Sequence, residues 1–242
     1  MSVFRTIGEV VPGGIVAVCD HAGNAVPPGY DLGVPQSVLD DHMGWDIGTA
    51  GVMEQLAARH AIPGFLACWS RLVIDLHREE DSPALVPEMS DGVPIPGNLP
   101  ASPNPDRAER IRTLHRPYHD ALGQWLDAAQ PALVLAIHSF TPMLASRPEE
   151  RPWHVGLLYN RDDRAARIAM ELFGQEDGIV VGDNEPYSGR LLNATMDRHA
   201  EAFGRPYCTI EIRNDLIRDA AGQRDWADQV ARMARAVVGR LA

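Results

Sequence analysis

The sequence of 242 residues contains no lysine, and all 22 of its basic residues are arginine. Catalysis through a lysine Schiff base is therefore excluded, and so is the lysine of a phosphate-binding P-loop. No strand-like run is followed by the Gly-x-Gly-x-x-Gly pattern of dinucleotide-binding folds. This second absence argues against a dinucleotide cofactor.

Net positive charge and long apolar runs are absent as well. The formal net charge of -11 argues against nucleic acid as a partner, because phosphates attract a basic surface. No apolar run approaches the roughly 20 residues of a membrane-spanning helix, so no membrane partner is expected. Residues 1–11 carry Arg5 and Glu9 and lack the apolar core of a secretory signal, which predicts a cytoplasmic protein.

Cysteine is scarce, and the three cysteines show no paired spacing. They are Cys19, Cys68 and Cys208. All three lie in apolar, strand-like contexts, which predicts buried, reduced thiols. The rest of the composition, with 45% hydrophobic and 23% charged residues, is ordinary for a soluble globular protein.

Strand-like and helix-like segments alternate along the chain. Short apolar runs predict buried strands, and apolar positions at helical spacing predict helices. Strands are expected at about 15–20, 64–76, 132–138, 154–159, 178–181 and 206–212, and helices at about 36–60, 106–129, 161–173 and 224–241. This order predicts an α/β fold, with one three-layer α/β/α domain over residues 1–242 and a mostly parallel or mixed central sheet.

A Pro/Gly-rich loop at about 82–105 interrupts this alternation. A loop of this length inside a compact domain usually serves as a lid, a substrate loop or a linker. We expect it to cover a small pocket, whereas a peptidase that cleaves a polymer needs an open groove.

Three of the apolar runs end on a reactive polar side chain. The runs at about 15–20, 133–137 and 207–210 lead into His21, His138 and Glu211. Ligands of open α/β sheets bind outside the carboxyl ends of the strands, so these side chains are expected at one sheet edge. Two imidazoles and a carboxylate are typical of a hydrolytic metal site. The sequence therefore predicts a zinc-type hydrolase.

A catalytic zinc ion takes three protein ligands and leaves a position for water, so His21 and His138 need a third donor. We choose Asp46, a carboxylate on the helix after the first strand. Asn24 competes because zinc peptidases often place a glutamate three residues after the histidine, although a neutral amide is a poor zinc ligand. His42 competes because it shares a helix face with Asp46.

The catalytic carboxylate is predicted to be Glu211, which lies between two isoleucines in mid-strand. A carboxylate there is costly unless it is paired or functional. We expect Glu211 to act as general base or acid towards the attacking water.

Arginines are candidates for substrate contact. Arg71 and Arg78 bracket an apolar segment, and one could polarise the scissile carbonyl while the other clamps a carboxylate. A structural pair of Asp75 with Arg78 is the alternative. Tyr187 and Arg190 lie in a loop that could close over substrate.

Together these segments resemble the N-formylglutamate amidohydrolase family, which is similar in fold to zinc carboxypeptidases and aspartoacylase (the phosphorylase/hydrolase-like fold). Each matching motif is short, but they follow the expected order over nearly the whole chain. The matching segments are 19–24, 44–48, 70–78, 114–119, 136–140, 184–189 and 209–215.

The resemblance implies one Zn²⁺ ion, or another divalent metal, bound by His21 and His138, with Glu211 activating the water. Arg71 and Arg78 would face the substrate, a small anionic N-acyl amino acid such as N-formylglutamate. Hydrolysis of its amide bond would release formate, or another acid, and the amino acid. We also assign Asn24, Tyr187 and Arg190 to substrate binding. The alternatives are a carboxypeptidase-like zinc peptidase and a metal-free binder of acidic metabolites.

The sequence departs from related patterns at two positions. The wider zinc-peptidase motif His-x-x-Glu has Asn24 in place of the glutamate. The usual Asp-Leu-Asn-Arg segment of the family has His77 in place of the asparagine, at a position that would line the substrate pocket.

Overall fold

The computed structural model describes residues 2–242, and its centre is a seven-stranded mixed sheet with the strand order β1-β3-β2-β6-β9-β7-β8. The four strands β3, β2, β6 and β9 run parallel to one another, whereas β1 and β7 are antiparallel to their neighbours β3 and β9. The bounds are β1 (Phe4–Ile7), β2 (Ile15–Cys19), β3 (Gly64–Ala67), β6 (Leu133–Phe140), β7 (Val155–Leu158), β8 (Val181–Asp183) and β9 (Tyr207–Arg213).

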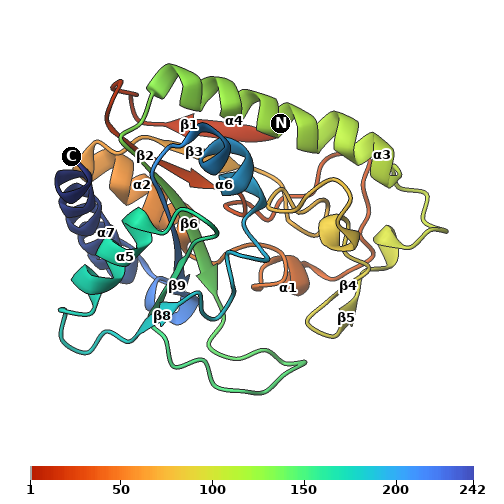
Figure 1. Cartoon of the computed structure of the whole chain (residues 1–242). Coiled ribbons are helices and arrows are strands. Elements are labelled where there is room, and N and C mark those ends of the chain that lie inside the picture. The colour runs from red at the N-terminus through yellow and green to blue at the C-terminus, as the bar shows by residue number, and fades with distance from the viewer. Residues whose placement is uncertain (1) are drawn as a thin grey trace.

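Helices cover both faces of this sheet, so the predicted three-layer α/β class is confirmed (Figure 1). Helices α2, α5 and α7 pack on one face, and α4 and α6 lie on the other. Their bounds are α2 (Thr49–His60), α4 (Arg116–Ala129), α5 (Arg164–Phe173), α6 (Ala194–His199) and α7 (Ala220–Leu241), with short helices α1 (Gln36–Leu39) and α3 (Arg107–Arg110).

The alternation of side chains along each strand explains the two apolar cores. Successive side chains of a strand point to opposite faces. In β2, Ala17 and Cys19 join the core under α2 and α7, whereas Val16 and Val18 join the core under α4. Because both faces are covered, the central strands can be apolar at every position, which is why they appear as continuous apolar runs in the sequence.

Three element predictions were wrong in extent. The helix expected at 36–60 is divided into α1 and α2 by a turn, because Gly48 adopts a left-handed conformation with φ of 86°. The strand expected at 64–76 ends at Ala67, and the remainder forms turns that lead into the cavity described below. Strand β1 and helix α6 were not predicted. The strand expected at 178–181 begins only at Val181.

The helix expected at 106–129 runs through Pro117 without a break. Before Pro117 the chain forms a π-helical turn, Ile111–His115, between α3 and α4. Proline is tolerated in the first turn of a helix, where its missing N–H is not needed. A π turn of this kind is often found near functional sites.

The Pro/Gly-rich segment 82–105 is held by specific hydrogen bonds. It contains 3-10 turns and a hairpin of β4 (Met89–Ser90) and β5 (Val93–Pro94). The buried guanidinium of Arg110 donates to the carbonyls of Val73 and Gly97 and to the side chain of Asn98. These contacts fix the segment against the α4 face of the molecule. Within residues 2–242 no helix has both the length and the apolar character to cross a bilayer.

We predict that Gly48→Ala lowers the free energy of unfolding by at least about 2 kcal/mol, because a left-handed alanine is strained. Its Cβ would also lie 2.2 Å from the carbonyl oxygen of Ile217. The control is Gly239→Ala in α7, where no atom would lie within 4 Å of the new Cβ. That variant should be stabilised by up to about 1 kcal/mol. Urea denaturation measures both, and an unchanged Gly48→Ala midpoint would contradict the prediction.

Candidate active site

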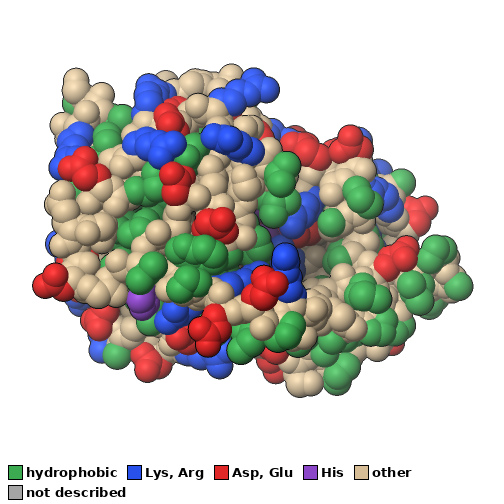
Figure 2. All heavy atoms as spheres, turned by 60° about the horizontal axis from the view of Figure 1, so that its bottom comes forward, with side chains coloured by type: hydrophobic (Ala, Val, Ile, Leu, Met, Phe, Trp, Pro, Cys, Tyr) green, Lys and Arg blue, Asp and Glu red, His purple; other side chains and the backbone are tan. Residues whose placement is uncertain are grey.

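A cavity opens at the carboxyl ends of the parallel strands β2, β6 and β9. His21 follows β2, while His138 of β6 and Glu211 of β9 are direct neighbours in the sheet register. Figure 2 views the molecule from this side and shows a hollow with arginine side chains beside it. The cavity has a volume of about 120 Å³. Its lining residues are His21, His42, Asp46, Arg71, His77, Arg78, His138, Ser139, Phe140, Thr141, Leu158, Tyr187, Leu192 and Glu211.

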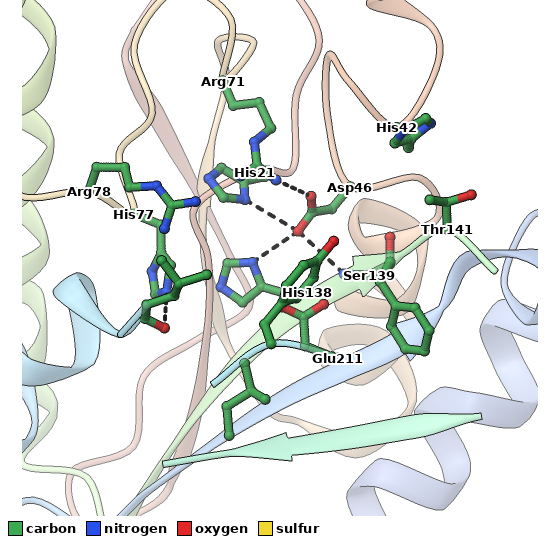
Figure 3. Close-up of a pocket in the computed structure, with 14 residues that line it drawn as sticks. His21, His42, Asp46, Arg71, His77, Arg78, His138, Ser139, Thr141 and Glu211 are labelled. Atoms are coloured by element: carbon green, nitrogen blue, oxygen red, sulfur yellow. Dashed lines mark hydrogen bonds and ion pairs between the residues drawn. The ribbon is translucent and has the colours of Figure 1, made fainter. Parts of the chain in front are cut away.

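Asp46 brings the two strand-end histidines together (Figure 3). Its Oδ2 lies 3.3 Å from Nδ1 of His21 and 2.9 Å from Nδ1 of His138. The backbone N–H of Asp46 donates to the carbonyl of His21, which fixes the turn before α2 against the end of β2. All three side chains are buried. The structure thus places the three predicted metal ligands in one cluster.

This cluster fits a zinc ion. A tetrahedral zinc ion with ligands at about 2.0–2.1 Å holds neighbouring donor atoms roughly 3.3 Å apart. The distances from Asp46 Oδ2 to Nδ1 of His21 and to Nδ1 of His138, 3.3 Å and 2.9 Å, are close to that value. Two imidazoles and one carboxylate are a donor set that zinc uses in hydrolases. The cluster also borders the cavity, which leaves room for a water molecule and a substrate.

The other two candidates for the third ligand lie elsewhere. His42 lines the cavity, but its Nδ1 contacts Asp41 and its Nε2 contacts Asp91. Asn24 donates to Oδ1 of Asp40 and is not among the described residues that line the cavity. The position three residues after His21 therefore faces away from the cluster.

Arg71 bridges the carboxylates of Asp46 and Asp75. Its guanidinium donates to Asp46 Oδ1 over 3.1 Å and to Asp75 Oδ2 over 2.9 Å. Asp75 also contacts Nε2 of His21 over 2.7 Å. Burial alone raises the pKa of Asp75, but Arg71 and His21 together hold it well below its ordinary value. Asp75 is therefore ionised and orients both side chains.

Glu211 is the carboxylate without a partner. It is buried, and its Oε2 has no hydrogen bond to any described residue. Burial raises the pKa of Glu211 to about 7, opposed by the charge of His138 and assisted by the negative charge of Asp46. A carboxyl group of this pKa can both accept and return a proton near neutral pH.

Of the four residues assigned to substrate binding, Arg78 and Tyr187 line the cavity. The Nε of Arg78 lies 3.6 Å from Asp75 Oδ2 and has no hydrogen-bond partner among the described residues. The hydroxyl of Tyr187 accepts a hydrogen bond from Arg151, whose guanidinium also lies over the ring. Arg190 is exposed and, like Asn24, is not among the described lining residues.

The segment that carries Arg78 is anchored from behind by buried histidines. The Nε2 atoms of His115 and His119 lie 3.0 Å from the carbonyl oxygens of Arg78 and Leu76. His119 Nδ1 lies 3.0 Å from Nε2 of His199. Burial lowers the pKa values of all three histidines, so they are neutral near pH 7.

The geometry is that of a hydrolase, since a potential metal cluster and a proton-accepting carboxylate share one cavity at the edge of an α/β sheet. A family model for N-formylglutamate amidohydrolase matches residues 13–218. The chain therefore belongs to the N-formylglutamate amidohydrolase family, as the sequence motifs predicted. A comparison with curated proteins gives no match.

Two solved structures resemble the whole chain. The gene product Atu2144 from Agrobacterium tumefaciens is 28% identical with a TM-score of 0.89, and the match covers 100% of this chain and 96% of that one. An N-formylglutamate amidohydrolase from Ralstonia eutropha JMP134 is 21% identical with a TM-score of 0.69, and the match covers 98% of both chains. The second likeness shows the shared fold.

We predict that Arg71→Met lowers the free energy of unfolding of the metal-free protein by about 3–5 kcal/mol, because Asp46 and Asp75 lose the cation between them. The control is Arg59→Met, which removes a half-exposed ion pair with Asp228. That loss should stay below about 1 kcal/mol. Chemical denaturation in the presence of a chelator measures both, and equal losses would contradict the role of Arg71 as the cation shared by two buried carboxylates.

Proposed function

We propose that this protein hydrolyses the amide bond of N-formylglutamate or a similar small N-acyl amino acid in a zinc-dependent reaction. The products would be formate, or another acid, and the free amino acid. The observation that carries the proposal is the position of Glu211, which lies in the same cavity as the His21–Asp46–His138 cluster and has a pKa near 7.

His21, Asp46 and His138 would hold the ion, since their donor atoms face one another at the cavity wall. Zinc bound there would polarise the acyl carbonyl and lower the pKa of a water molecule. Asp75 contacts the far nitrogen of His21 and would fix the orientation of that ring as a ligand.

Glu211 would carry the proton. Its unpartnered Oε2 accepts the proton of the attacking water and then delivers it to the nitrogen of the leaving amine. Burial keeps this carboxyl group away from bulk water, so the proton is retained within the cavity between the two steps.

Arg71 and Arg78 would contact different groups of the substrate. Arg71 is fixed by its bonds to Asp46 and Asp75 and still has N–H groups left to stabilise the oxyanion that forms on the acyl carbonyl. Arg78 has no hydrogen bond at its Nε and would bind a carboxylate of the amino acid.

The size of the cavity favours a small substrate. A cavity of about 120 Å³ suits a small molecule such as N-formylglutamate, whereas a peptide chain requires an open groove. The segment 82–105 contributes no lining residue to this cavity, but its Asp91 contacts His42, which lines the cavity.

We predict that Glu211→Gln lowers kcat by about 10²–10⁴-fold, because the amide cannot accept the proton of the attacking water. Zinc content should stay unchanged, because Glu211 is outside the ligand cluster. Steady-state formate release and metal analysis of the same sample measure the two effects. Turnover at the wild-type rate would contradict the role of Glu211.

We also predict that removal of the metal with a chelator abolishes formate release and that one equivalent of zinc restores it. The assay should include N-formylglutamate, other N-formyl amino acids and short peptides. The highest kcat/KM is expected for an N-formyl amino acid with a carboxylate side chain. Preferred cleavage of peptides would favour the carboxypeptidase-like alternative, and full activity without metal would contradict the zinc-dependent reaction.

A further inference from the structure

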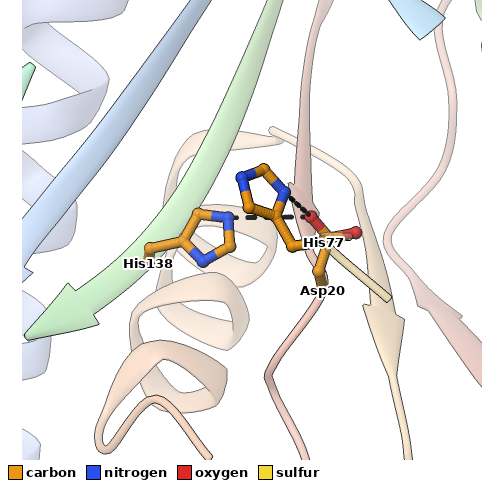
Figure 4. A group of neighbouring side chains, drawn as sticks. All are labelled: Asp20, His77 and His138. Atoms are coloured by element: carbon orange, nitrogen blue, oxygen red, sulfur yellow. Dashed lines mark hydrogen bonds and ion pairs between the residues drawn. The ribbon is translucent and has the colours of Figure 1, made fainter. Parts of the chain in front are cut away.

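A second carboxylate, Asp20, lies directly behind His138. It precedes His21 in the chain but faces the opposite side of the strand end, and it is completely buried. Its Oδ2 lies 3.6 Å from Nε2 of His138 and 3.0 Å from Nδ1 of His77 (Figure 4). Its Oδ1 accepts a hydrogen bond of 2.8 Å from the hydroxyl of Tyr118.

The two nitrogens of His138 face two different carboxylates. Nδ1 lies 2.9 Å from Asp46 in the zinc cluster, and Nε2 points towards Asp20. A neutral imidazole has one lone pair and one N–H. If Nδ1 gives its lone pair to a zinc ion, Nε2 must carry the proton and can donate it only on the Asp20 side. Nε2 is buried and has no hydrogen bond to any described residue, and the Asp20 carboxylate lies 3.6 Å from it.

We propose that Asp20 is a positioning residue that accepts the Nε2 proton of His138 and thereby fixes Nδ1 as its zinc-binding atom. The inference rests on the zinc site of the proposed function. His21 has the equivalent partner in Asp75, so each of the two histidine ligands has a buried carboxylate on its far nitrogen. Such carboxylate–histidine–zinc arrangements fix the tautomer and the ring orientation of the ligand.

Hydrogen bonds from neighbouring side chains hold the carboxylate of Asp20 in this position. Tyr118 of α4 binds one oxygen, and His77 binds the other. His77 Nδ1 is also 3.1 Å from the hydroxyl of Thr195 in α6. The histidine that replaces the usual asparagine of the family motif therefore has a structural partner: His77 donates to Oδ2 of Asp20, the same oxygen that faces His138.

The donor atoms of Asp20, His77 and His138 are close enough to be an ion site of their own. Three observations favour the positioning role instead. Both oxygens of Asp20 already have partners, and Asp20 is not among the described residues that line the cavity. In addition, His138 would have to lose both ring protons to bind two ions.

The first test uses the wild-type protein loaded with one equivalent of zinc. Long-range ¹H–¹⁵N NMR of the histidine rings should show His138 bound to zinc through Nδ1, with a protonated Nε2 that exchanges slowly with water. Zinc binding through Nε2 of His138 would overturn the proposal. Two equivalents of tightly bound zinc, one of them lost in His77→Asn, would also overturn it.

The second test measures zinc affinity by competition with a chromophoric chelator. Asp20→Asn should weaken zinc binding by about 10–100-fold, the usual effect of losing such a carboxylate. Tyr118→Phe, which removes one donor to Asp20 but leaves the carboxylate facing His138, should weaken zinc binding less. Asp228→Asn, an equivalent change in a surface group that contacts Arg59 and His60, should leave the affinity unchanged.

Zinc binding by the Asp20→Asn variant and by the wild-type protein test different claims. Wild-type zinc affinity in a folded Asp20→Asn protein would overturn the role of Asp20, while leaving the zinc enzyme intact. A wild-type protein that binds no zinc would overturn the proposed function itself. If Asp20→Asn does not fold, the NMR measurement on the wild-type protein decides the question.

Discussion

The arrangement of the cavity depends on the buried carboxylate of Asp46, which contacts side chains from three distant segments. A buried carboxylate is stable only when charged or polar partners replace its water. Asp46 obtains them from three distant segments, namely His21 after β2, Arg71 in the turns after β3, and His138 with the backbone N–H of Ser139 in β6. The edge of the sheet that lines the cavity is therefore arranged around the carboxylate of Asp46. The same carboxylate forms, with His21 and His138, the set of donor atoms that could bind a metal ion.

Much of this edge could be predicted from the sequence because strand ends are easy to locate. Apolar runs that lead into His21, His138 and Glu211 mark the carboxyl ends of buried strands, and parallel strands bring such ends together. The register confirms the expectation for His138 and Glu211, which are direct neighbours. The three-layer arrangement followed from the alternation of strands and helices for the same reason.

Other features depend on contacts between distant residues, which a single sequence does not display. The break before α2 occurs because Gly48 passes close to Ile217, far along the chain. The spacing of Asn24 from His21 suggested a ligand position, but its side chain donates to Asp40 instead. Asp20 was not assigned a role, since its proximity to Tyr118 and to the far side of His138 appears only in three dimensions.

The neutral histidines that pack behind the segment carrying Arg78, among them His119 and His199, make the stability of the protein depend on pH. The bond between His119 and His199 needs one donor and one acceptor, and burial lowers the pKa of His199 to about 4. In the unfolded chain both imidazoles take up protons near their ordinary value of 6.5. Below that value the unfolded chain binds more protons than the native state, so falling pH erodes stability from about 6.5 towards 4. Mild acidity therefore loosens the support of the substrate-facing segment before most surface carboxylates have titrated.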